Sequence, residues 1–331
     1  TFTESKGTVF YRLRTAKDVV VLVVTLLAYG CPLQAIVIAF GLDERTVLDW
    51  QARAGRHCQG VHEHLVEQPR DLGQVQADEI RVKMQGGILW MAMAMQIQTR
   101  LWLGGVFSTA RDMNLIVALM HKVRHSALCR SLLFCVDGCV AYVGAIRSVF
   151  REPIRNGQPG RPPLRPWDGI YIAQVVKRYA HKHVVAVSRR IVQGTQTQID
   201  ALLQATQGGG SNNTAYIERL NATFRSRITA LIRRGRALAR QTITLHNAMY
   251  LVGTVYNFCA YHQSLRVPLV LPNNRRRWLR RTPAIAAGVT DHLWTVQELL
   301  SFRVPPPPWK PPRRRGRPSN ALKSLVAQWC S

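Results

Sequence analysis

Three carboxylate residues stand out in a sequence that carries few acids. Asp78 lies within a β-like run, and Asp137 ends a buried apolar run. Glu218 is the only acid in residues 201–290. Carboxylate oxygens are hard ligands, and three that converge could hold two Mg²⁺ ions about 4 Å apart, with Mn²⁺ as a substitute. Such ions activate a water or a DNA 3′-hydroxyl and stabilise the leaving oxygen of a phosphodiester. The three acids therefore predict metal-dependent phosphodiester chemistry.

The pair Asp78-Glu79 leaves the first of these positions open. Neighbouring side chains of a strand point to opposite faces, so only one of the two is expected to face the site. We assign that position to Asp78. A single acid at a strand end is usually a solvated carboxylate or a turn residue. The strand positions, order and scarcity of the three acids favour the metal-site interpretation.

The elements around the first two acids are predicted from hydrophobic periodicity. The expected strands cover residues 74–81, 88–98, 100–107 and 131–136. The expected helices cover residues 111–125 and about 139–150. Three strands in a meander, a helix, a buried strand and a helix open a ribonuclease-H-like α/β domain.

Glu218 is expected early in a further helix. The apolar stripe of this helix consists of Ile217, Leu220, Phe224, Ile228 and Leu231. This spacing is helical. Ala222 and Arg225 lie four and seven positions after Glu218, so they share its face of the helix.

Residues 16–57 are predicted to form three helices that resemble a helix-turn-helix. Asp43 is expected to cap the last helix, over residues 45–55. In this interpretation the helix enters the major groove of DNA, while Val47 and Trp50 pack inward. The side chains expected to contact DNA are Arg45, Thr46, Asp49 and Arg53. A three-helix core without DNA contact is the alternative.

The composition points to a polyanionic partner. The 331 residues include 45 Lys+Arg and 18 Asp+Glu, for a formal net charge of +27 with 47% hydrophobic residues. So much apolar side chain excludes a disordered basic tail. The charge argues against an ordinary metabolic enzyme, because such self-repulsion is normally tolerated where a polyanion neutralises it. Eight of the basic residues are lysine, and arginine suits bidentate phosphate recognition. Double-stranded DNA is therefore the expected partner.

The apolar runs and the cysteines indicate where in the cell the protein is expected. No strongly apolar run approaches the roughly 20 residues that a bilayer requires, so no membrane association is expected. The seven cysteines contain no C-x-x-C pair. That pattern favours reduced thiols, and we expect a bacterial or archaeal cytoplasmic protein associated with the nucleoid.

Two-thirds of the excess charge lies after Glu218. Residues 219–331 hold 20 basic residues and two acids. The arginines expected to line DNA beyond Glu218 are Arg225, Arg227, Arg233 and Arg234. A solvated basic helix is the alternative.

A second basic segment, residues 313–318, resembles an AT-hook core. An extended Gly-Arg-Pro fits the narrow minor groove of A·T tracts. The residues expected to contact DNA there are Arg314, Gly316, Arg317 and Pro318. A flexible basic tail that binds phosphates without selection is the alternative.

Several short motifs along the chain belong together. They are Asp78-Glu79, Trp90, Thr99-Arg100, Arg111-Asp112, Val136-Asp137-Gly138, Ile217-Glu218-Arg219-Leu220-Asn221, Arg225-Ser226-Arg227, Arg233-Arg234 and Tyr256-Asn257-Phe258. Over most of residues 1–300 the chain resembles a DDE transposase of the insertion-sequence-one family, most specifically around Glu218. The resemblance implies a ribonuclease-H-like catalytic domain with Asp78, Asp137 and Glu218 as catalytic metal ligands. It further implies cleavage and strand transfer at terminal inverted repeats without a covalent protein–DNA intermediate.

Two features depart from that family. Its members usually have an N-terminal cysteine-rich zinc-binding module, which no cysteine pair here matches, so we expect no zinc within this chain. The opening Thr1-Phe2-Thr3-Glu4 resembles the sequence just after that module, so the start is expected to be truncated. The segment of 80 residues between Asp137 and Glu218 is also long and Pro-rich, and an insertion is expected within it at about 151–170.

Two weaker motifs remain. His62-x-His64 invites a zinc site, but the spacing matches no common structural site, so ordinary histidines are favoured. His121-Lys122-Val123-Arg124 matches the His-x-x-Arg of tyrosine recombinases, which attack DNA with a tyrosine hydroxyl. This match keeps a tyrosine-type recombinase as an alternative.

Together these observations predict a multidomain α/β protein. Residues 1–66 would form the helix-turn-helix domain, 67–265 the ribonuclease-H-like catalytic domain and 266–331 a basic Pro/Arg-rich C-terminal region. The predicted function is a DNA transposase that acts on DNA as a homodimer or larger assembly. A non-catalytic sequence-specific DNA-binding protein, such as a decayed transposase, is the other alternative.

Overall fold

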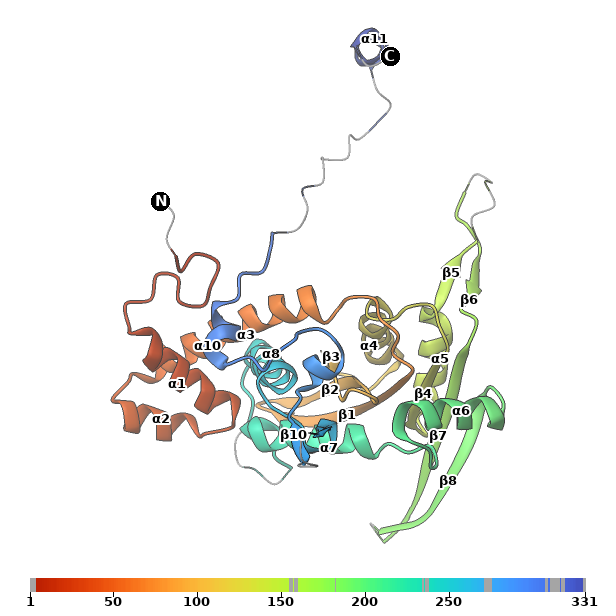
Figure 1. Cartoon of the computed structure of the whole chain (residues 1–331), viewed down its shortest axis with the longest axis horizontal. Helices are drawn as coiled ribbons and strands as arrows, with labels where there is room; N and C mark the ends of the chain where they lie inside the picture. Colours follow the sequence, from red (N-terminus) through yellow and green to blue (C-terminus); the bar gives the residue numbers. More distant parts are fainter. Residues whose placement is uncertain are drawn as a thin grey trace.

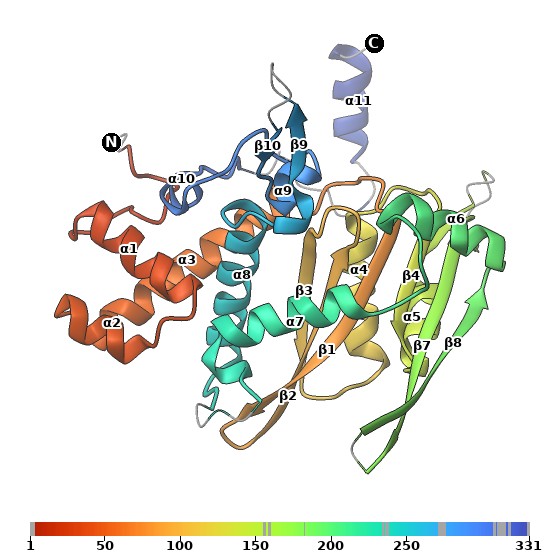
Figure 2. The ribbon, with the colours of Figure 1, turned by 60° about the horizontal axis from the view of Figure 1, so that its bottom comes forward.

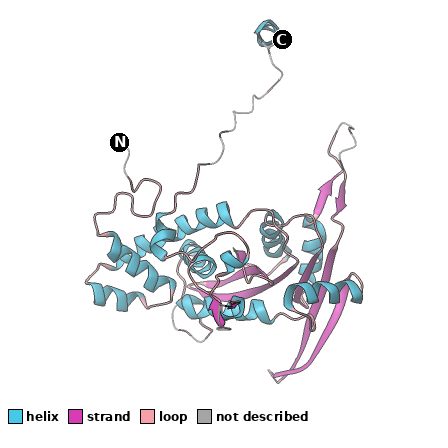
Figure 3. Cartoon of the chain, viewed as in Figure 1, coloured by secondary structure: helices cyan, strands magenta, loops and turns pink. Residues whose placement is uncertain are grey.

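The computed structural model is built around one mixed β-sheet. It describes residues 4–154, 157, 160–181, 183–233, 235, 238–270, 276–306, 309, 316 and 319–329. The sheet has six strands in the order β3-β2-β1-β4-β7-β8, with helices on both of its faces (Figures 1, 2 and 3). The predicted α/β class is confirmed.

The strands of the sheet are β1 Gln74–Met84, β2 Gly87–Gln96, β3 Trp102–Ser108, β4 Leu132–Asp137, β7 Ile170–Ala180 and β8 His183–Gln193. Two short ribbons pair β5 Arg151–Pro153 with β6 Leu164–Pro166, and β9 Val267–Val270 with β10 Arg276–Leu279. The helices of the first half are α1 Lys17–Ala28, α2 Leu33–Phe40, α3 Glu44–Leu65, α4 Met113–His125 and α5 Val140–Val149. Those of the second half are α6 Gln196–Gln207, α7 Ala215–Arg227, α8 Thr242–Phe258, α9 Pro283–Ala286, α10 Val296–Ser301 and α11 Asn320–Trp329, with 3₁₀ turns at Thr229–Leu231 and Gln263–Leu265.

The strand directions decide which ends meet. β1, β2 and β3 form an antiparallel meander, and β1, β4 and β7 run parallel to one another. The succession of meander, α4, β4 and α5 is the one on which the ribonuclease-H-like prediction rested. Because these strands are parallel and β4 is shorter than its neighbours, Asp137 at the carboxyl end of β4 lies beside the middle of β1 and of β7.

The two faces of the sheet are covered by different helices. α6 and α7 cover one face, and α4 and α5 cover the other (Figure 2). Alternation along β4 follows this division. Leu133 and Cys135 pack with α6, whereas Phe134 contacts Phe150 just after α5, with ring centroids 5.1 Å apart.

The third helix is longer than predicted. The Asp43 side chain caps α3 by accepting a hydrogen bond from the backbone N–H of Arg45 at 2.8 Å, and Val47 and Trp50 are buried, as expected. The helix does not end at Gly55 but continues to Leu65. A Cβ on Gly55 would lie 2.5 Å from Asn247 of α8. The glycine therefore permits close packing of two helices and is not a stop.

Other boundaries also differ from the prediction. β1 continues to Met84, and β3 begins at Trp102 because Arg100 adopts a left-handed turn with φ of 59°. The apolar stripe predicted around Glu218 is buried throughout, but α7 ends at Arg227 and the stripe finishes in the following 3₁₀ turn.

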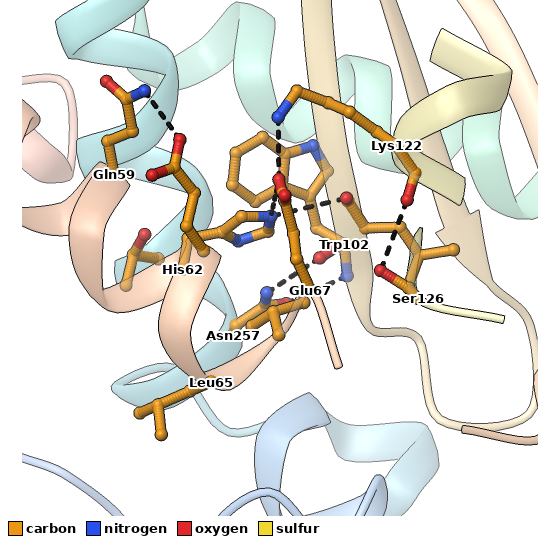
Figure 4. A network of polar contacts seen from close by, with 12 residues as sticks. Gln59, His62, Leu65, Glu67, Trp102, Lys122, Ser126 and Asn257 are labelled. Atoms are coloured by element: carbon orange, nitrogen blue, oxygen red, sulfur yellow. Dashed lines mark hydrogen bonds and ion pairs between the residues drawn. The ribbon is translucent and has the colours of Figure 1, made fainter. Parts of the chain in front are cut away.

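A polar network joins the N-terminal helices to the sheet (Figure 4). His62 of α3 lies 3.3 Å from the backbone oxygen of Leu103, and Lys122 of α4 pairs with Glu67 at 2.7 Å. Asn257 of α8 bonds both the N–H and the C=O of Trp102. Burial, and then the Lys122 charge, lowers the pKa of His62 to about 3. His62 is thus a neutral core residue in this network.

Candidate active site

The sheet register brings two of the predicted acids together. The last pair between β1 and β4 is Gln76 with Cys135, so Asp78 and Asp137 each lie two residues further along adjacent parallel strands. One carboxylate oxygen each of Asp78, Glu79 and Asp137 can be chosen so that all lie within 4.8 Å of one another. Among the described residues, this is the group of three or more acids, histidines or cysteines that could share a metal ion.

Glu79 was not expected in this group. The two neighbours do leave opposite faces of β1: Asp78 accepts a hydrogen bond from Asn221 of α7 at 2.7 Å, and Glu79 turns toward Arg111. Both nevertheless line the same cleft. Since Asp137 lies at the open end of β4, it is reached from both faces, and the expectation that only one neighbour faces the site is corrected.

The negative charge of the cluster affects the pKa of Asp78. Burial, and then the charge of Glu79, raises the pKa of Asp78 to about 6, with further contributions from Asp137 and Glu218. A cation bound here would relieve this crowding of carboxylates. The donor set therefore fits a hard divalent ion.

Arg111 bridges two members of the cluster. Its guanidinium donates to Glu79 Oε2 at 2.7 Å and to Asp137 Oδ2 at 3.1 Å, and it lies over the Trp90 ring. The Glu79 side chain is 1% exposed, against 39% for Arg111. The Glu79 carboxylate also acts on the buried Tyr142 hydroxyl, whose pKa is raised by burial and then by the charge of Glu79 and a hydrogen bond to it. Asp137 also accepts from the backbone N–H of Cys139 at 3.0 Å, which fixes its second oxygen.

Glu218 of α7 lines the same cleft, which has a volume of about 1020 Å³. It accepts hydrogen bonds from Thr214 at 2.7 Å and from Lys177 of β7 at 2.5 Å. Partial burial would raise its pKa, but these two hydrogen bonds and the charges of Lys177 and Arg233 together outweigh that effect and lower it. Glu218 is not within the tight group of three, although its charge reaches Asp78.

Basic side chains line the cleft beside the acids. Ala222 and Arg225 share the Glu218 side of α7, as predicted, and Arg233 follows on the same wall. The Nε atom of Arg225 is buried without a partner in the described part of the chain. Arg227 instead lies over the Tyr29 ring at 4.5 Å, outside the cleft. Arg234 falls outside the described residues.

The predicted DNA-contacting residues of α3 are accessible. Arg45 and Asp49 are exposed, and Thr46 and Arg53 are half-buried. Arg53 pairs with Asp49 at 2.7 Å and also contacts the backbone oxygen of Tyr11. Their contact with DNA stays a prediction.

Of the AT-hook-like segment, only Gly316 lies within the described residues, and it is exposed. Arg314, Arg317 and Pro318 lie outside them. In the His-x-x-Arg motif, Arg124 donates to the backbone oxygen of Arg151 and lies 5.0 Å from the centre of the Trp167 ring. Neither His121 nor Arg124 lines the cleft.

Sequence reasoning gave no role to three side chains of the site, Arg111, Lys177 and Asn221, and it weighed Glu79 only as the alternative to Asp78. Asn221 could have been found, since it lies three positions after Glu218 on the same helix. Lys177 could not, because the contact between β7 and α7 depends on strand order.

No family model matches the sequence, and no curated protein matches it. Among solved structures, the chain is similar to one in the intasome of simian T-cell lymphotropic virus in complex with PP2A regulatory subunit B56 gamma. The two share 13% identity with a TM-score of 0.29, over 89% of this chain and 80% of that one. A TM-score of this size does not establish a common fold. Among the described helices, none is both long and apolar enough to cross a bilayer.

Proposed function

We propose that this protein is a DNA transposase of the DDE type, which cuts phosphodiester bonds and transfers DNA strands with the help of divalent metal ions. The observation that carries the proposal is the cleft itself. Asp78 within β1 and Asp137 at the carboxyl end of β4 lie on adjacent parallel strands, and Glu218 of α7 lines the same cleft. A site of this kind with arginines on its wall suits a phosphate-containing substrate.

The acids would hold the metal, and their neighbours hold the acids. Asp78, Asp137 and Glu218 are the proposed ligands of Mg²⁺, with Mn²⁺ as a substitute. When bound, such ions activate the attacking oxygen and stabilise the leaving oxygen. Asn221 orients Asp78 from α7. Thr214 and Lys177 likewise hold the Glu218 carboxylate on the cleft wall.

The basic residues would bind the substrate. Arg225 and Arg233 lie beside the acids on the cleft wall. Arg225, whose Nε has no hydrogen-bond partner among the described residues, brings to the cleft a guanidinium of the kind that binds phosphate oxygens. The resemblance to the insertion-sequence-one family supports terminal inverted repeats as the DNA and a homodimer or larger assembly as the active form.

The test is a cleavage assay on a duplex that carries the DNA flanking the coding frame. Asp137→Asn and Glu218→Gln should each abolish Mg²⁺-dependent cleavage while DNA binding, measured in EDTA, stays at the wild-type level. Asp200→Asn is the matched control, because Asp200 is an exposed acid of α6 outside the cleft, and it should cleave normally.

The outcomes separate the alternatives. Cleavage by Asp137→Asn near the wild-type rate would refute the metal-site assignment. DNA binding without cleavage by the wild-type protein, on its own ends and in Mg²⁺ or Mn²⁺, would identify a non-catalytic DNA-binding protein. A covalent protein–DNA adduct formed in EDTA would identify a tyrosine-type recombinase.

A further inference from the structure

The hairpin of β7 and β8 projects beyond the end of β4, its neighbour in the sheet. β4 pairs with β7 from Leu132 opposite Ile170 to Asp137 opposite Val175, and there β4 ends. β7 continues for five more residues to Ala180, paired only with β8. At about 3.3 Å per residue, the hairpin extends roughly 16 Å past the level of Asp137. Figures 1 and 2 both show this ribbon continuing past the end of β4.

The outer strand of the ribbon is largely exposed. Nine of the eleven residues of β8 are exposed, including Val184, Val185 and Val187. β8 is also the last strand in the sheet order, so its outer edge pairs with no other described strand. An exposed, long edge strand normally promotes aggregation unless charge or a partner protects it.

The charge of the ribbon has one sign. Residues 170–193 contain five Lys or Arg residues and no acid. Register distributes them over both faces, since residues directly opposite share a face. Arg189 opposes Val175 and thus lies on the same face as Lys177, whereas Arg178 lies on the other face. Positive side chains on both faces suit a ribbon that lies within a groove, where phosphates run along both sides.

The base of the ribbon is part of the cleft. Val175, Val176 and Lys177 line it, and Lys177 contacts Glu218. DNA whose phosphate lies at the acids therefore continues past the ribbon on leaving the cleft. The major groove of B-DNA, about 12 Å wide, accepts a two-stranded ribbon.

We infer that the β7–β8 hairpin is a DNA-binding arm that docks in the groove of the duplex next to the bond being cut. This inference rests on the proposed function for the position of the DNA. Pairing of β8 with β8 of a second copy would also cover the edge. Charge argues against it, because two strands that both carry Arg189 and Arg190 would be brought together.

The experiment measures binding of a fluorescent 40-base-pair duplex in EDTA over a range of salt concentrations. The arm variant is Arg178→Gln with Arg189→Gln, both at exposed positions. The matched control removes the same charge through Arg14→Gln with Arg130→Gln, exposed residues that precede α1 and β4. Each lost phosphate contact lowers the salt slope of log K by about 0.9, so the arm variant should lose about 1.8 relative to the control.

Two further variants keep the test decisive. Arg189 donates to the backbone oxygen of Asn212, so its loss could perturb the fold, and Arg178→Gln alone should lower the slope by about 0.9. Replacing residues 179–185 by Asn-Gly shortens the ribbon with a turn that suits a two-residue hairpin. This variant should bind more weakly than wild type and keep its circular dichroism spectrum.

The results distinguish failure of the arm from failure of the proposed function. If the salt slope of log K for Arg178→Gln equals that of the control, the hairpin is not a DNA-binding arm. Loss of self-association in sedimentation, with the slope unchanged, overturns the inference in favour of pairing between copies. If the wild-type protein binds no duplex at any salt concentration, the proposed function fails as well.

Discussion

Arg111 holds a buried carboxylate at the candidate active site, and its removal should have a large effect on stability. In Arg111→Gln, Glu79 would lose two charge-assisted hydrogen bonds, at 2.7 and 3.1 Å. Glu79 is 1% exposed, so water cannot replace them. Breaking a buried ion pair by removing one partner costs about 3–5 kcal/mol. Because Arg111 itself is 39% exposed, we expect the lower end, about 3 kcal/mol.

A double-mutant cycle isolates this interaction. Glu79→Gln removes the buried charge, so Arg111→Gln should cost about 2 kcal/mol less in that background than in the wild-type protein. The assay is urea unfolding without divalent metal, followed by circular dichroism. Arg165→Gln is the matched control, since Arg165 pairs with Glu152 on the surface, where solvent screens the interaction, and its unfolding curve should hardly move.

The cycle can also refute the reasoning. If Arg111→Gln unfolds at the same urea concentration as Arg165→Gln, the pair at the cluster does not stabilise the fold. If the cost of Arg111→Gln is the same with and without Glu79→Gln, Glu79 is not the group that Arg111 neutralises.

Three further predictions concern Gly253, His62 and Asp78. Gly253→Ala should destabilise the fold by about 1–3 kcal/mol despite the better helix propensity of alanine, because its Cβ would lie 2.2 Å from the Trp102 ring; an unchanged melting temperature would contradict this. His62 takes up no proton in the folded state until about pH 3, whereas its pKa in the unfolded chain is about 6.5. The stability that depends on a neutral His62 is therefore complete above pH 6.5 and is lost as the pH falls. Between pH 7 and 5, His62→Gln should therefore lose about 2 kcal/mol less unfolding free energy than wild type, and equal losses would rule out a neutral buried His62. Millimolar Mg²⁺ should raise the melting temperature of wild type but not of Asp78→Asn, and an equal rise in both would place the ion elsewhere.

Local patterns were enough to predict the helices and strands of residues 16–150 and the helix that carries Glu218, but not the strands β7 and β8 between them. The apolar stripe through Ile217 and Phe224 is buried as expected, and Asp43 caps α3. The order of the meander, α4, β4 and α5 also agrees with the prediction. These features depend on interactions within a few residues of the chain, which is the range that periodicity and capping report.

The sequence by itself thus determined the scarcity of acids, the two strand-borne aspartates and the face that Glu218 shares with Arg225. Only the tertiary structure decided which side chains join them. Register at the end of β4 admits Glu79 as well as Asp78, strand order places Lys177 against Glu218, and helix packing turns Arg227 toward Tyr29. Gly55 is a further example, because the close approach of α8, and not local helix propensity, explains why a glycine lies within α3. Such contacts join segments far apart in the chain, so their geometry is set by the packing of whole elements and leaves no local pattern.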